Sequence, residues 1–126
     1  NLVIAAFVYY FVGLVISRLG SLVIEPLLKK IRFLRFAKYE DFITAARQDS
    51  KIEIFSEVNN MYRTFCAMFI LLALAKFYEW IQAKLPIIVE WNSLFIIALL
   101  FSIFLYSYRK QTDYIRKRIE TNNKKV

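Results

Sequence analysis

The sequence has no histidine, one cysteine, two glycines and two prolines among its 126 residues. The lack of histidine excludes a His-based catalytic triad and a His-containing metal site. Cys66, the single cysteine, lies in an apolar stretch and is best explained as a small packing residue. Gly13 and Gly20 both fall in the first apolar segment, which excludes a glycine-rich phosphate-binding loop. We therefore predict that the protein is not an enzyme and has no cofactor or metal.

Long apolar segments are the main positive feature of the chain. Hydrophobic residues make up 59% of it, and its mean hydropathy is +0.43, which is too apolar for an ordinary soluble domain of this length. A membrane-crossing helix needs about 20 mostly apolar residues. Three segments meet this requirement, at about residues 2–24, 61–83 and 86–108. The sequence predicts an all-α integral membrane protein, a single membrane domain over residues 1–126 with three transmembrane helices.

Polar stretches beside these segments predict a cytoplasmic helical layer at about residues 29–63 and 109–122. An amphipathic helix is expected over residues 39–48, because apolar residues recur there at helical spacing: Tyr39, Phe42, Ile43 and Ala46. Ser50 and Glu53 have the spacing of a capping box, so a second helix should begin at Lys51 and continue into the membrane. Pro26 should end or kink the first helix.

The third helix should also continue beyond the membrane and end near Asn122 and Asn123. It has an apolar seam with spacings of four and three, formed by Phe101, Leu105, Tyr108, Thr112, Ile115 and Ile119. We expect this seam to pack against the part of the second helix between Lys51 and Arg63. The second helix has its own apolar positions at Phe55, Val58, Tyr62 and Phe65.

Basic residues predict the orientation. Eight lie between Lys29 and Arg63 and seven follow from Arg109 onward, whereas the stretch joining the second and third spans has only Lys76 and Lys84. Positively charged loops remain on the cytoplasmic side, which predicts that the 29–63 loop and the C-terminus lie in the cytoplasm. The chain starts with Asn1 and not Met, so we expect something upstream to have been removed or left out.

The net charge of +8 is concentrated on this predicted cytoplasmic side. Its densest part alternates cations with apolar residues, as expected of a segment that lies among anionic lipid headgroups: Lys29, Lys30, Arg32, Arg35 and Lys38. A soluble cytoplasmic protein could dock on the same layer. Direct nucleic-acid binding is the least favoured alternative, although basic residues near aromatic ones are also typical of it.

Two further patterns lie within the spans. Small residues form much of a stripe on the first helix, at Ala6, Tyr10, Gly13, Ser17 and Gly20, and small side chains allow membrane helices to approach closely. The stripe could pack within the chain or between copies, and we expect a homo-oligomer.

Ionisable residues at membrane depth are Arg18, Lys76, Glu79 and Glu90. They either reach the membrane interface or mark an ion pathway.

The stretch from Lys38 to Arg63, with Lys38-Tyr39-Glu40-Asp41-Phe42 and Ser50-Lys51-Ile52-Glu53-Ile54-Phe55, precedes an apolar hairpin from Thr64 to Tyr108. In this organisation the chain resembles small multi-span bacterial inner-membrane proteins of anti-phage defence systems. The resemblance implies an effector or sensor subunit that alters membrane integrity or ion permeability with a cytoplasmic partner. Alternatives are a membrane anchor that recruits a soluble enzyme and a small transporter. The spans have few polar residues, so conduction should be conditional, through a narrow or hydrophobic constriction.

Replacing Gly13 and Ser17 together with Leu should disrupt the oligomer, because two large side chains would block close approach along the stripe. Sizing of the purified protein in detergent measures this. An unchanged oligomer would count against the stripe as the interface.

Overall fold

The computed structural model describes residues 1–124, and this part of the chain is helical with no β-strand. In chain order the elements are α1 (Leu2–Leu19), the π-helical segment η1 (Gly20–Ile24), α2 (Glu25–Lys30), α3 (Tyr39–Gln48), α4 (Lys51–Lys84), α5 (Ile87–Glu90) and α6 (Asn92–Asn123). Three continuous helical stretches are long and apolar enough to cross a membrane: Leu2–Lys30, Lys51–Lys84 and Asn92–Asn123. The predicted all-α class is confirmed. Each of the three apolar segments predicted from sequence falls mainly within one of these helical stretches.

The first helix does not end at Pro26 but continues to Lys30. The turn before the proline is π-helical, and the Glu25 amide donates to the Gly20 carbonyl, five residues back. This wider turn accommodates Pro26 inside a continuous helical stretch, because proline has no amide of its own to donate. Of the two alternatives predicted at Pro26, an ending or a kink, the ending is therefore wrong, and a π turn before the proline lets the helix continue.

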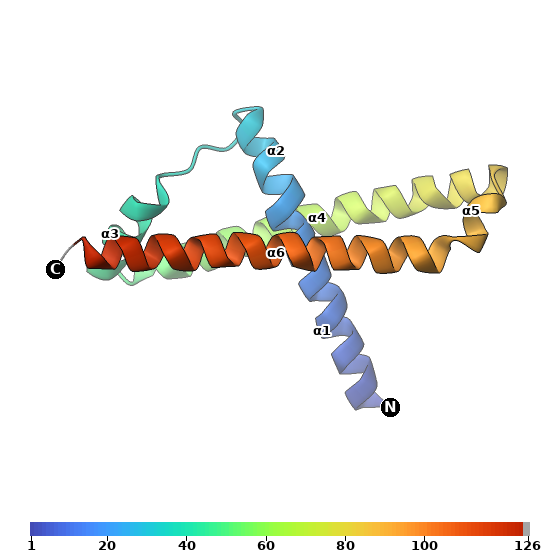
Figure 1. Ribbon diagram of the computed structural model, residues 1–126, viewed down its shortest axis with the longest axis horizontal. Coiled ribbons are helices and arrows are strands. Elements are labelled where there is room, and N and C mark those ends of the chain that lie inside the picture. The colour runs from blue at the N-terminus through green and yellow to red at the C-terminus, as the bar shows by residue number, and fades with distance from the viewer. Residues whose placement is uncertain (125–126) are drawn as a thin grey trace.

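α4 and α6 form a long hairpin that is closed by α5, and α1 runs across this hairpin instead of alongside it (Figure 1). α1, η1 and α3 each contact both long helices, whereas α4 and α6 hardly contact each other. Direct links between the two arms lie near their ends, where the Tyr78 hydroxyl donates to the Asn92 side-chain oxygen and Arg118 lies 3.8 Å from Glu53. The hairpin is therefore held together by the segments placed between its arms.

The predicted packing of the third helix on the second is corrected in the same way. α3 contacts both arms at the end away from α5, with Ile43 only 2% exposed. Its Tyr39 ring lies 4.9 Å from the Tyr114 ring of α6, measured between centroids. The expected helix at residues 39–48 is thus confirmed, but it fills the space where direct contact between α4 and α6 was expected.

Both predicted apolar seams face outward. On α6, Phe101 is 68% exposed and Tyr108 is 76% exposed, and on α4 Phe55 is 67% exposed. The inward faces of these helices instead carry polar groups, among them Ser107 and Arg63. Large exposed apolar surfaces are unfavourable in water and compatible with lipid, so the exterior of the protein suits a membrane.

Helix boundaries agree closely with the sequence. α4 begins at Lys51, as predicted, although the capping residue differs. The Asp49 side chain accepts the Lys51 amide at 3.0 Å, and the Ser50 side chain makes no capping bond. α6 ends at Asn123, as expected from the asparagine pair.

Replacing Gly20 with Leu should destabilise the fold by about 1–3 kcal/mol through overpacking. A Cβ at this position would lie 3.3 Å from the Arg63 carbonyl oxygen and 3.4 Å from the Ala67 Cβ. Gly13→Leu is the matched control, because a Cβ there meets nothing within 4 Å among the described residues. Thermal unfolding of monomeric protein in detergent measures the difference. Equal unfolding temperatures for the two variants would contradict the close approach at Gly20.

Candidate functional site

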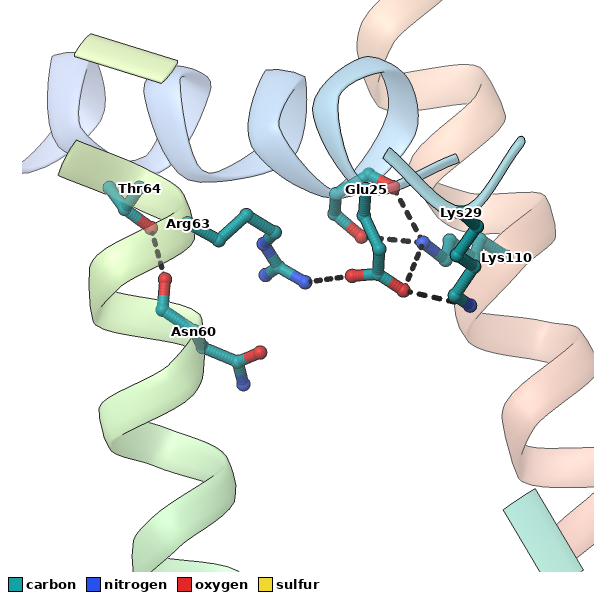
Figure 2. Close-up of polar contacts among 7 residues, drawn as sticks. Glu25, Lys29, Asn60, Arg63, Thr64 and Lys110 are labelled. Atoms are coloured by element: carbon teal, nitrogen blue, oxygen red, sulfur yellow. Dashed lines mark hydrogen bonds and ion pairs between the residues drawn. The ribbon is translucent and has the colours of Figure 1, made fainter. Parts of the chain in front are cut away.

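An ionic cluster around a buried carboxylate lies where the first helix crosses the hairpin. Glu25 begins α2 and is only 8% exposed, and its carboxylate points into the space between α4 and α6 (Figure 2). Arg63 of α4 donates to Glu25 Oε2 at 2.5 Å. On the other side, Lys29 Nζ lies 3.3 Å and Lys110 Nζ of α6 lies 3.8 Å from Glu25 Oε1. We call Glu25, Arg63, Lys110 and Lys29 the Glu25 junction, because one carboxylate joins all three long helices.

The π turn provides a second contact for Lys110. Its ammonium donates to the Ser21 carbonyl at 2.6 Å and to the Ser21 hydroxyl at 2.8 Å. In a π-helical turn the Ser21 carbonyl would accept from residue 26, which is Pro26 and has no amide hydrogen. Lys110 therefore satisfies a buried carbonyl that proline leaves without a donor. The local irregularity of the first helix is stabilised by a residue of α6.

The junction has more positive than negative charge. Three cations surround one carboxylate, and removing such ions from water carries a desolvation penalty that only their mutual attraction offsets. Loss of the carboxylate would leave the cations to repel one another. The arrangement therefore depends strongly on Glu25.

A cavity of about 560 Å³, lined by both polar and apolar side chains, lies beside the junction. Its wall includes residues from the first helical stretch, α3, α4 and α6. Uncharged polar groups on this wall include Asn59 and Asn60 of α4 and Gln111 of α6. The junction and this cavity therefore place ionisable groups between helices whose outer faces are apolar, and ionisable groups in such a position often have a function.

The residues predicted from sequence are distributed unevenly around this site. Of the stripe, Ala6, Tyr10 and Gly13 are exposed on the free half of α1, Ser17 is half-buried, and Gly20 packs on α4. Of the membrane-depth charges, only Arg18 reaches the cavity. Lys76 and Glu79 form an exposed pair at 3.5 Å, as their spacing allowed, and Glu90 is exposed on α5.

Only one residue of the predicted basic layer belongs to the Glu25 junction. Lys29 belongs to the junction, and its ammonium lies 4.5 Å from the centroid of the Phe36 ring. The Lys29 side chain is still 45% exposed, and the other four members are exposed as well, namely Lys30, Arg32, Arg35 and Lys38. Cys66 is exposed on α4. Residues 1–124 contain no group of three acidic or cysteine side chains placed to hold a metal ion.

Sequence reasoning missed four residues of the site: Ser21, Glu25, Arg63 and Lys110. The sequence does contain a signal for this site, because each apolar segment has an ionisable residue at its predicted cytoplasmic end. These residues are Glu25 after the first segment, Arg63 at the start of the second and Lys110 after the third. One acidic and two basic residues at matching depth are able to pair.

Comparison of the chain with protein-family models, curated proteins and solved structures gives no match. The functional argument therefore rests on this geometry.

Replacing Glu25 with Ala should destabilise the protein by about 3–5 kcal/mol, because it leaves buried cations without their counter-ion. Glu79→Ala is the control, since its exposed pair with Lys76 should contribute about 1 kcal/mol or less. Unfolding by heat or denaturant in the same detergent measures both. Similar losses for the two variants would show that the Glu25 junction does not hold the helices together.

Proposed function

We propose that the protein is a membrane effector or sensor subunit whose ion permeability changes when a signal or partner rearranges the Glu25 junction. The observation that carries this proposal is the Glu25 carboxylate, which is buried beneath an apolar exterior. It is bound by Arg63 of one hairpin arm and lies beside Lys110 of the other. Burying a charge cluster carries a large desolvation penalty that its contacts only just offset. A change in those contacts can therefore shift the protein from one helix arrangement to another.

The packing of the hairpin supports a rearrangement. α4 and α6 hardly contact each other and are held through η1 and α3, so weakening the junction frees one arm from the other. The faces that would then separate carry polar groups, whereas the halves of α4 and α6 nearer α5 are apolar. This combination favours a closed hydrophobic constriction that opens conditionally.

The free half of α1 supports assembly from several copies. Its side chains are largely uncovered, with Leu2 88% exposed and Phe7 68% exposed. Three helices of one chain are too few to enclose an aqueous path, so we propose that copies associate through this half, including the stripe from Ala6 to Gly13. The proposed setting is a bacterial inner membrane with the 29–63 loop and the C-terminus in the cytoplasm, as in the anti-phage defence proteins that the chain resembles.

A membrane anchor for a soluble enzyme is the second candidate. The connection between α2 and α3 favours it, because this non-helical stretch exposes Arg32, Arg35 and the Phe33 ring, which is 75% exposed. Such a surface could bind a soluble partner as well as lipid. An anchor would need no conductive state.

Glu25→Gln and Arg63→Gln should each raise ion flux several-fold over the wild-type protein in phosphatidylcholine liposomes, because each weakens the link between the hairpin arms. Dye-reported potassium flux measures this, and circular dichroism confirms that the variants are helical. Glu79→Gln should behave as the wild type. Folded junction variants that remain as impermeable as the wild type would contradict the effector proposal and favour the anchor.

A further inference from the structure

We propose that the cavity beside the Glu25 junction binds a phosphate monoester, with Arg18 and Arg63 as the residues that grip the phosphate. The consequence for permeability rests on the function proposed above, whereas the binding itself does not. The inference starts from the charges on the cavity wall. Four cationic side chains line it, Arg18, Lys29, Arg63 and Lys117, and they face one carboxylate, Glu25, among the described residues.

Two arginine groups in the cavity have unused hydrogen-bond donors. The Nε atoms of Arg18 and Arg63 are both buried and have no hydrogen-bond partner within residues 1–124. Arg63 uses Nη1 to bind Glu25, so its Nε remains available. Buried donors in folded proteins are nearly always satisfied, so these two guanidinium groups, both on the cavity wall, have donor capacity that the rest of residues 1–124 does not use.

The chemistry of these donors indicates a phosphate. A guanidinium presents parallel N–H groups that match the oxygens of a phosphate or carboxylate in a bidentate arrangement. Lys117 is already paired with Asp113 at 3.1 Å. The other charged groups of the wall, Arg18, Lys29 and Arg63 against Glu25, have an excess of two positive charges, which a dianion compensates better than a single carboxylate does. Asn60 and Tyr114 also line the cavity and could donate to further phosphate oxygens.

The size and position of the cavity limit the source of the phosphate. A volume of about 560 Å³ suits a small molecule or a lipid headgroup, and excludes a folded partner. The cavity lies near the predicted cytoplasmic ends of the spans, where both an anionic lipid and a soluble phosphate ester are accessible. The two sources share one recognition chemistry.

Binding would also act on the junction. A phosphate held by Arg63 competes with Glu25 for the same guanidinium, because the two anions repel each other and share one cation. The ligand would thereby weaken the contact between Glu25 of α2 and Arg63 of α4, which links the first helical stretch to the hairpin. This gives the proposed effector a chemical trigger.

The experiment measures binding to the delipidated full chain in neutral detergent. Inorganic phosphate is titrated by calorimetry, and native mass spectrometry detects lipid retained from phosphatidylcholine vesicles with and without phosphatidic acid. Saturable binding of about one phosphate or one phosphatidic acid per chain is expected. Binding of phosphate alone identifies a soluble source, and retention of phosphatidic acid that phosphate does not displace identifies a lipid source.

Variants locate the site. Arg18→Gln should weaken binding at least tenfold, whereas Arg35→Gln, which removes the same charge from the exposed segment, should leave it unchanged. Arg18→Lys retains the charge without the planar fork and should give an intermediate loss, which keeps the test informative if Arg18→Gln is poorly folded. Equal weakening by Arg18→Gln and Arg35→Gln, or no saturable binding of either probe, would overturn the proposal.

Flux separates this inference from the proposed function. Increased flux in Glu25→Gln without any phosphate binding would overturn the site and leave the effector function standing. Saturable binding at Arg18 with no flux from the wild type or any junction variant would overturn the effector function and leave the site standing.

Discussion

The carboxylate of Glu25 holds together three helices that have few other reasons to associate. Lipid is as apolar as a protein core, so apolar side chains give membrane helices little preference for one another. In this protein α4 and α6 hardly meet, and few apolar side chains of residues 1–124 are buried: Ile24 of η1, Ile43 of α3, Ala67 of α4 and Ile103 of α6. The attraction between Glu25 and cations of both arms is therefore the interaction on which the arrangement depends, and its strength comes from the low dielectric of the interior.

The irregular turn of the first helix is part of the same junction. Pro26 removes the amide that the Ser21 carbonyl would accept, and the ammonium of Lys110 replaces it. Lys110 also lies near Glu25, so one side chain of α6 is linked to both the backbone defect and the carboxylate. Because the π turn, the proline and the ion cluster are adjacent, a change at any one of them affects the position of the first helix relative to the hairpin. Such coupling is a physical basis for the conditional behaviour that we propose.

The local structure was largely predictable, and the site was not. The helix at Tyr39–Gln48 and the start of α4 at Lys51 follow from apolar periodicity and from the polar break before Lys51, and both are local properties of the chain. The apolar seam that includes Phe101 and Tyr108 also follows from periodicity, but the prediction that it packs against α4 is wrong, because both side chains are exposed. The role of Glu25 has no such local signal, because its partner Arg63 lies 38 residues away along the chain.

The sequence by itself determined three apolar helices, their approximate lengths and the ends at which charged residues gather. Only the tertiary structure decided which face of each helix turns inward, that α3 and η1 separate the hairpin arms, and that Glu25, Arg63 and Lys110 meet. The physical reason is that periodicity shows which residues share a face of a helix, but not what covers that face. In water an apolar face must turn inward, whereas in a membrane lipid can cover it equally well, and the polar contacts then decide the packing.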